Sequence, residues 1–281
     1  MQKDIEDLIK YSKKLEGKKI SEIASPDSLD ALHEHWNKVE TGEIKYMNKA
    51  TINDIIENDY FKVPRNSSEL PDIILENGES VELKVSHLFK SRGLIRPKFR
   101  LVLKVLNYID MAENAHWWKS ALYKKLKLML IVFYYKDEDK PPWEWIIVNA
   151  FLWSGLDYKE RIQQDYDYTR KRILEGKKIS ESDTTFLANC PKHGSKFCWW
   201  CHLEIECTNP KKPNPPPHPV KQGALRPHPK LGKAEKRGYC IPAQRMALIF
   251  CKEMNLPLER ESTSYGINIE KIPYLDPKLH M

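Results

Sequence analysis

The stretch that decides the fold is PDIILENGESVELKV, residues 71–85 of a chain of 281 residues. Two runs rich in Ile, Leu and Val flank the dipeptide Asn77-Gly78, and this composition predicts two strands joined by a hairpin loop. Successive side chains of a strand point to opposite faces, so Glu82 and Lys84 share one face. The second strand therefore presents a carboxylate and an ammonium group to the same space.

The length of the loop decides whether Asp72 joins these two groups. A two-residue loop at Asn77-Gly78 would pair Ile73 with Glu82 and leave Asp72 on the opposite face. A three-residue loop, 76–78, with Gly78 in the left-handed conformation, pairs Asp72 with Glu82 instead. We predict the three-residue loop, which brings two carboxylates and a lysine to one point.

Two carboxylates beside a lysine suit the hydrolysis of a phosphodiester. Asp72 and Glu82 can hold a hard divalent cation such as Mg²⁺, which keeps several waters and bridges to phosphate. Such an ion stabilises the charge of a phosphoryl transition state, while Lys84 can orient the attacking water. The pattern D-x₉-E-x-K also fits an exposed, charge-rich hairpin, and on its own it is a weak signal.

Apolar periodicity and capping residues predict helices and strands around the hairpin. Residues 4–16 repeat apolar positions at helical spacing, and Ser28 is the expected N-cap of a second helix. Thr51 is the expected N-cap of a short helix that ends near Glu57, and a polar helix is expected over 157–174. The segments expected as further strands of one mixed sheet are 100–108, 126–135 and 143–153.

Composition describes a globular chain. Hydrophobic residues make up 41%, charged residues 30%, and six cysteines are spread unevenly, while the mean hydropathy of -0.60 is typical of soluble proteins. No apolar run approaches the roughly 20 residues that cross a bilayer, and the N-terminal residues lack the apolar core of a secretion signal. We expect a cytoplasmic protein without a membrane partner.

The positive charge is concentrated between Cys190 and Cys240. This stretch holds ten Lys and Arg against three Glu, so its surplus of seven equals the net charge of +7 of the whole chain. Prolines cluster at 213–219 and favour an extended, exposed arm. Both a DNA phosphate contact and a solvated surface loop fit this basic arm.

A cysteine cluster lies at the start of the basic arm. The C-x₂-C spacing of Cys198 and Cys201 is typical of one half of a tetrahedral zinc site. A structural Zn²⁺ ion and free thiols remain alternatives, because one such pair is only half of the usual signal. The candidate zinc ligands are Cys190, Cys198, Cys201 and Cys207, with His193 and His202 nearby in the sequence.

Several segments stand in the order found in one known family. Val81-Glu82-Leu83-Lys84-Val85 is similar to its signature strand, 54–57 to its helix with a site glutamate, and Lys125 to its second catalytic lysine. Together they resemble the MutH family of PD-(D/E)XK nucleases, which comprises the strand-nicking mismatch-repair endonuclease and restriction enzymes that cut GATC. The resemblance spans roughly residues 5 to 255, with further similar segments at 15–23, 100–103, 107–108, 182–187 and 242–245.

This resemblance implies an α/β fold, a restriction-endonuclease-like mixed sheet flanked by helices, to which the Cys/His/Pro-rich basic arm is added. It also implies catalytic roles for Glu57 and Lys125. Without it, Glu57 reads as an exposed helix residue and Lys125 as part of a solvated face. We expect two domains, 1–189 with the catalytic core and 190–281 with the basic arm and the DNA-recognition lobe.

The expected function is that of a Mg²⁺-dependent, sequence-specific DNA endonuclease of the type II restriction kind, cutting GATC or a related short palindrome. The alternatives are a mismatch-repair nicking enzyme and a DNA-binding module whose site has decayed. Expected partners are double-stranded DNA and a cognate DNA methyltransferase, for a monomer or homodimer. Arg245 can read guanine or bind phosphate, and the residues expected to contact DNA are Lys192, Lys211, Lys212, Arg226 and Arg245.

Overall fold

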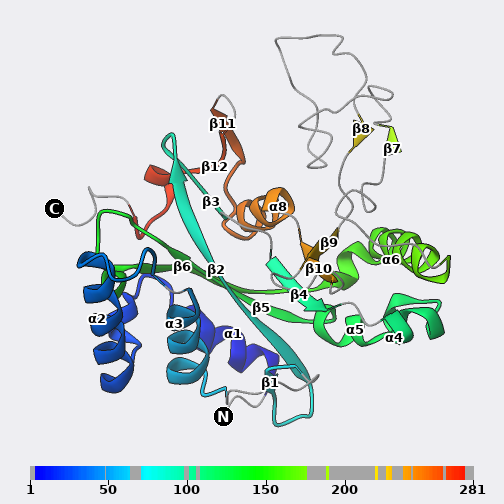
Figure 1. The fold of residues 1–281 in the computed structure, drawn as a ribbon, viewed down its shortest axis with the longest axis horizontal. Coiled ribbons are helices and arrows are strands. Elements are labelled where there is room, and N and C mark those ends of the chain that lie inside the picture. The colour runs from blue at the N-terminus through cyan, green and yellow to red at the C-terminus, as the bar shows by residue number, and fades with distance from the viewer. Residues whose placement is uncertain are drawn as a thin grey trace. The chain divides into compact units, whose positions relative to one another are not determined.

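A computed structural model describes most of the chain, and its residues form two compact units (Figure 1). The first unit comprises 1–98, 128–154 and 250–281, and the second comprises 99–127 and 155–249. No helix among the described residues is long and apolar enough to cross a lipid bilayer. The described residues are 4–47, 49–63, 71–97, 101–105, 108–175, 188–189, 219–220, 226–229, 237–241, 243–261 and 264–275.

A mixed sheet is the centre of the first unit, as the sequence predicted. Within the described residues it has seven strands in the order β11-β12-β3-β2-β5-β6, with β1 paired to β2. β2 and β5 run parallel, whereas every other pair of neighbours in this sheet is antiparallel. The strands are β1 Ile73–Ile74, β2 Ser80–Ser91, β3 Leu94–Pro97, β5 Met129–Tyr135, β6 Ile146–Trp153, β11 Glu259–Glu261 and β12 Ser264–Asn268.

Three α-helices precede the sheet in the chain: α1 Ile5–Lys13, α2 Pro26–Glu40 and α3 Lys49–Asp54. The N-cap of α2 is Ser25 and not Ser28, because Pro26 is suited to the first helical position and the Ser25 side chain accepts a hydrogen bond from Ser28 N. α3 begins before Thr51, so Thr51 is not its N-cap either. The helix continues as a π-helix, η2 Ile55–Tyr60, in which the next turn is wider.

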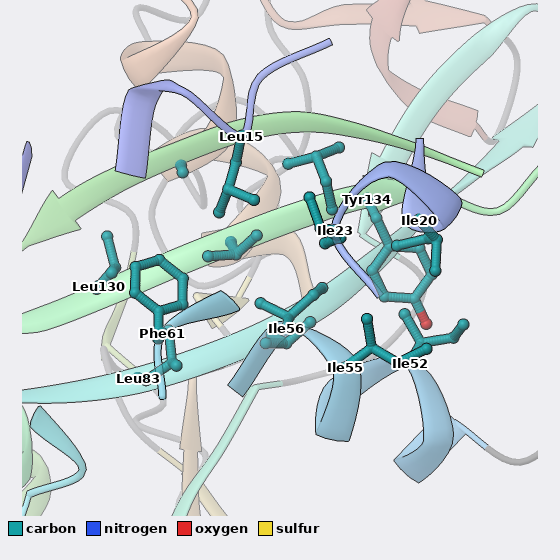
Figure 2. Packing of buried hydrophobic residues seen from close by; sticks show 14 of the residues in the cluster. Leu15, Ile20, Ile23, Ile52, Ile55, Ile56, Phe61, Leu83, Leu130 and Tyr134 are labelled. Atoms are coloured by element: carbon teal, nitrogen blue, oxygen red, sulfur yellow. The ribbon is translucent and has the colours of Figure 1, made fainter. Parts of the chain in front are cut away.

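The apolar faces of these elements meet in one core (Figure 2). Ile52, Ile55 and Ile56 are at most 1% exposed, as their spacing predicted, and they belong to the same cluster as Leu83 of β2 and Leu130 of β5. Burying a side chain of this size contributes about 1.5–3 kcal/mol. Because Leu83 faces this core, its neighbours along β2 face the opposite side of the sheet.

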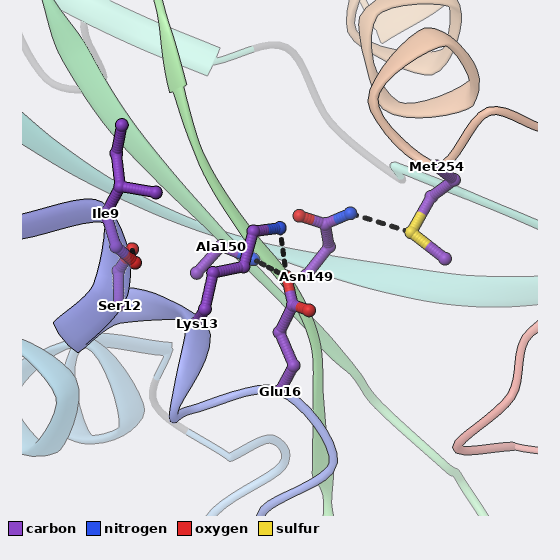
Figure 3. Close-up of polar contacts among 7 residues, drawn as sticks. All are labelled: Ile9, Ser12, Lys13, Glu16, Asn149, Ala150 and Met254. Carbon is purple, nitrogen blue, oxygen red and sulfur yellow. Dashed lines mark hydrogen bonds and ion pairs between the residues drawn. The ribbon is translucent and has the colours of Figure 1, made fainter. Parts of the chain in front are cut away.

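A polar contact joins the end of α1 to β6 (Figure 3). Glu16 Oε1 accepts a hydrogen bond from Ala150 N at 3.0 Å and lies 2.6 Å from Lys13 Nζ. The Glu16 side chain is only 15% exposed, so the carboxylate satisfies a backbone donor that water reaches poorly. This contact fixes the start of the chain against the sheet.

The second unit contains a separate antiparallel sheet in the order β4-β10-β9. The prediction that 100–108 joins the mixed sheet is wrong, because β4 pairs with β10 and the segment then turns into α4. The predicted polar helix is confirmed as α6. The elements are β4 Leu101–Val105, α4 Tyr108–Glu113, α5 Ala121–Leu126, α6 Lys159–Leu174, β7 Ala188–Asn189, β8 Pro219–Val220, β9 Arg226–Pro229 and β10 Arg237–Ile241.

One long helix is divided between the two units. It is α8 Ala243–Glu253, and its last residues belong to the first unit. The domain boundary predicted between 189 and 190 borders residues outside the described ranges and stays a prediction. Short helical turns complete the fold at η1 Ile20–Glu22, η3 Trp117–Lys119, η4 Pro142–Glu144, η5 Gly155–Tyr158 and η6 Ile269–Lys271.

Candidate active site

The hairpin of β1 and β2 has the predicted three-residue loop. Ile73 pairs with Val81, and Leu75 N donates a hydrogen bond to Glu79 O at 2.8 Å. Gly78 has a φ of +83°, the left-handed conformation that this loop requires of its last residue. The same register places residue 72 opposite residue 82, as predicted.

Asp72 is held by the backbone of the neighbouring strand. Glu82 N donates to Leu128 O at 3.0 Å, toward β5, so the next amide of β2 points toward β1. The pairing with β1 ends at Ile73, and Leu83 N donates to Asp72 Oδ2 at 2.9 Å instead. The side chain thus takes the place of the next backbone acceptor, and this bond fixes the carboxylate beside β2.

The ammonium group of Lys84 lies close to both carboxylates. Its Nζ lies 2.5 Å from Glu82 Oε1 and 3.9 Å from Asp72 Oδ2. The Glu82 side chain is 1% exposed, against 20% for Lys84 and 30% for Asp72. A carboxylate buried this deeply requires a charged partner, and Lys84 supplies it. We call Asp72, Glu82 and Lys84 the catalytic hairpin, after the catalytic role that is predicted for them.

Glu57 adds a third carboxylate, from η2. Burial raises its pKa to about 7, Lys84 opposes this shift, and the charges of Asp72, Asp54 and Glu82 add to it. The surroundings of the catalytic hairpin therefore carry more negative than positive charge. An added cation would relieve this excess.

The donor set fits a hard divalent cation. Carboxylate oxygens are the ligands that Mg²⁺ takes from proteins, usually one or two of them, with water and phosphate completing its octahedron. The described residues contain no cluster of three or more Asp, Glu, His or Cys that could enclose a metal ion. Asp72 and Glu82 would therefore supply two protein ligands to such an ion.

Sequence reasoning missed the π-helix that carries Glu57. Phe61 N donates to Ile56 O at 3.1 Å, a span of five residues. A signal was present, because the buried residues Ile52, Ile56 and Phe61 are separated by four and then five positions. An α-helix cannot keep the third of them on the same face, whereas one wider turn can.

The remaining predicted site residues fall in other parts of the chain. Lys125 lies in α5, Arg226 in β9 and Arg245 in α8, and their catalytic and DNA-binding roles stay predictions. The other predicted DNA contacts and zinc ligands lie outside the described residues: Lys192, Lys211, Lys212, Cys190, Cys198, Cys201 and Cys207.

Comparison with known proteins confirms the family resemblance. The family model described as DNA mismatch repair enzyme MutH matches residues 61–165, which include the catalytic hairpin and Lys125 but not Glu57. The match points to a DNA endonuclease of the restriction or mismatch-repair kind, a group that uses divalent metal ions. The mixed sheet with its helices is consistent with the PD-(D/E)XK fold. No curated protein matches the chain.

Proposed function

We propose that this protein is a sequence-specific, Mg²⁺-dependent DNA endonuclease of the type II restriction kind. The observation that carries the proposal is the convergence of Asp72, Glu82 and Lys84, with 2.5 Å and 3.9 Å from Lys84 Nζ to the two carboxylates. It lies within the segment that the MutH family model matches. A pair of acids that can hold a divalent cation, with an ammonium group beside them, suits phosphodiester hydrolysis.

Each residue of the site has a proposed role in hydrolysis. Asp72 and Glu82 would hold Mg²⁺, which when bound supplies charge stabilisation for the phosphoryl group and acidifies a water. Lys84 orients the attacking water, and Lys125 is proposed to assist it. Glu57 is ionised above about pH 7 and would position water as an acceptor.

DNA recognition is assigned to the region from Cys190 to Arg245, whose charge favours phosphate contacts. The proposed target is GATC or a related palindrome. One active site cuts one strand, so a double-strand break needs two copies of the chain or two successive nicks. A cognate DNA methyltransferase would protect the host's own sites, and both proteins would act in the cytoplasm.

A digestion assay tests this proposal. Plasmids with defined adenine and cytosine methylation are incubated with the purified protein in Mg²⁺, and the product ends are sequenced. We expect cleavage at one short palindrome, blocked or required by one methylation state, and dependent on Mg²⁺. An Asp72→Ala protein that folds normally and still cleaves at the wild-type rate would overturn the assignment.

A mismatch-repair nicking enzyme is the second candidate, favoured by the description of the matching family. Such an enzyme would be nearly inactive alone and would yield nicked circles only when a partner protein recruits it. A decayed DNA-binding module would shift DNA in a gel without Mg²⁺ and give no product with it. The assembled catalytic hairpin favours the active enzyme over the decayed module.

A further inference from the structure

Two tyrosines connect the element that carries Glu57 to the first helix. The Tyr11 hydroxyl of α1 donates a hydrogen bond to Tyr60 O at 2.9 Å, and the Tyr60 hydroxyl of η2 donates one to Tyr11 O at 2.8 Å. Their rings stack with centroids 4.6 Å apart. The contact is thus reciprocal, with two hydrogen bonds and one ring stack between the same pair of residues.

Each of these hydroxyls caps the helix of the other residue. α1 ends at Lys13 and η2 ends at Tyr60, so both accepting carbonyls belong to a last helical turn. Tyr11 O also accepts a hydrogen bond from Lys14 N at 3.2 Å. Burial raises the pKa of Tyr11 and raises that of Tyr60 to about 12, so both hydroxyls keep their protons and remain donors at neutral pH. Phe61 packs edge-on against both rings.

The π-helix needs such anchors because π-helical turns are rare and occur mostly as single local bulges within α-helices. The chain immediately after Glu57 supplies several. Asp59 Oδ2 accepts a hydrogen bond from Ser25 N at 2.9 Å, and Val63 N donates to Glu57 O at 2.9 Å. The tyrosine pair anchors Tyr60, which lies between Asp59 and Val63 in the sequence and three positions after Glu57.

We propose that Tyr11 and Tyr60 are positioning residues, which hold η2 so that Glu57 stays beside the catalytic hairpin. This role rests on the proposed function. Neither hydroxyl is assigned to substrate or metal, and both act only through the turn that carries the carboxylate. Loss of the Tyr11 hydroxyl removes the donor to Tyr60 O, and loss of the Tyr60 hydroxyl removes the bond that connects η2 to Tyr11 O, so either change loosens the turn that carries Glu57.

The expected effect is on turnover rather than on DNA affinity. A carboxylate that samples several positions spends less time in the productive one, and small misplacements lower kcat strongly. The DNA-binding residues are assigned elsewhere in the chain, so KM for DNA stays near its wild-type value. We expect about a tenfold fall in kcat for Tyr11→Phe and for Tyr60→Phe.

A matched control exists in the second unit. The Tyr166 hydroxyl also donates to a backbone carbonyl, that of Asn114, at 3.0 Å. Tyr166→Phe therefore removes a hydrogen bond of the same kind from a place that the proposal does not involve. We expect it to lower the unfolding free energy by about 1 kcal/mol, as the other two variants do, and to change kcat by less than about twofold.

The test combines these variants with Glu57→Gln in the full-length protein. Single-turnover cleavage in Mg²⁺ is measured for Tyr11→Phe and Tyr60→Phe, each with and without Glu57→Gln. We expect no further loss from either tyrosine variant once Glu57 is replaced, because residues that act through one group are not additive. Hydrogen exchange of the amides of Phe61 and Val63 should also accelerate in the tyrosine variants and not in Tyr166→Phe.

Two results would overturn the positioning role while the proposed function stands. One is cleavage by wild-type protein with unchanged kcat in both tyrosine variants. The other is a loss that adds in full to that of Glu57→Gln, which would show that the tyrosines act independently of the carboxylate. Absence of cleavage by the wild-type protein would overturn the proposed function itself, and the positioning role with it.

Discussion

The carboxylate of Asp72 accepts a hydrogen bond from the backbone N–H of Leu83, with 2.9 Å between Oδ2 and N. Backbone pairing of β1 with β2 stops one residue earlier, at Ile73. The acid therefore has two functions, because it ends the hairpin ladder and faces Lys84 at 3.9 Å. These two functions can be separated by substitution.

Asp72→Asn keeps an oxygen acceptor for Leu83 N and removes the negative charge. We expect cleavage to fall by about 10²-fold or more, as is usual when charge stabilisation of the transition state is lost, with a change in unfolding free energy under about 1 kcal/mol. Asp72→Ala should lose the same activity. Its unfolding free energy should fall by about 1–3 kcal/mol more, because the buried amide of Leu83 is left without its acceptor. Single-turnover cleavage and urea denaturation measure both effects. Equal stability of the two variants would contradict the anchoring role.

Lys84 should be required for stability as well as for cleavage. Lys84→Met removes the ammonium group that lies 2.5 Å from the carboxylate of Glu82, whose side chain is 1% exposed. Breaking such a buried pair costs about 3–5 kcal/mol, whereas replacing both members by uncharged groups costs much less. We expect the double variant Glu82→Gln/Lys84→Met to be more stable than Lys84→Met in chemical denaturation, and both to be inactive. A double variant less stable than Lys84→Met would show that the pair is not coupled.

The part of the site that could be predicted from sequence depends on local periodicity. The alternation of side chains along a strand placed Glu82 and Lys84 on one face, and the choice of loop length then determined where Asp72 falls. Both features are decided within 15 consecutive residues. The register of the hairpin depends on Gly78, which adopts the left-handed conformation that the three-residue loop needs.

Features that depend on distant partners were not predictable in this way. The segment 101–105 is a strand, but its apolar residues do not reveal that the partner strand is 237–241 rather than the central sheet. The N-cap of α2 was a local error instead, because Ser25 and Ser28 are equally good caps by composition and the adjacent Pro26 decides between them. The wide turn after Ile56 departs from the periodicity of 3.6 residues that was assumed, although the spacing of Ile52, Ile56 and Phe61 carried a signal of it.

The contact between Glu16 and β6 gives a prediction for stability alone (Figure 3). Glu16→Gln keeps an acceptor for Ala150 N, whereas Glu16→Ala removes it. We expect Glu16→Ala to lower the unfolding free energy by about 1–3 kcal/mol and Glu16→Gln by clearly less. Thermal or urea denaturation checks this order, and cleavage per folded molecule should stay unchanged in both. Equal losses in the two variants would mean that the ion pair with Lys13, which both of them remove, outweighs the backbone contact.

The pKa of Glu57 links the active site to the stability of the metal-free protein. Its value is about 7 in the folded chain, mainly because of burial, against an ordinary value of 4.5. Below pH 4.5 the group is protonated in both states, so its contribution to folding is fully present. Between these two values the unfolded chain has lost the proton and the folded chain still holds it. The contribution of Glu57 to stability must therefore fall as pH rises through this window and level off above about pH 7.

We expect this fall to amount to about 1–2 kcal/mol, after allowance for solvent screening of a carboxylate that is only partly buried. Chemical denaturation in EDTA between pH 4.5 and pH 8 measures it, with Glu57→Gln as the comparison, because an amide does not titrate in this range. The difference between the two stability curves isolates Glu57 from every other titrating group. Above pH 7, added Mg²⁺ should recover stability in the wild-type protein more than in the variant, since a cation offsets the repulsion that the ionised carboxylate feels from Asp72 and Glu82. Curves that run parallel over the whole range would show that Glu57 is solvated like an ordinary surface acid.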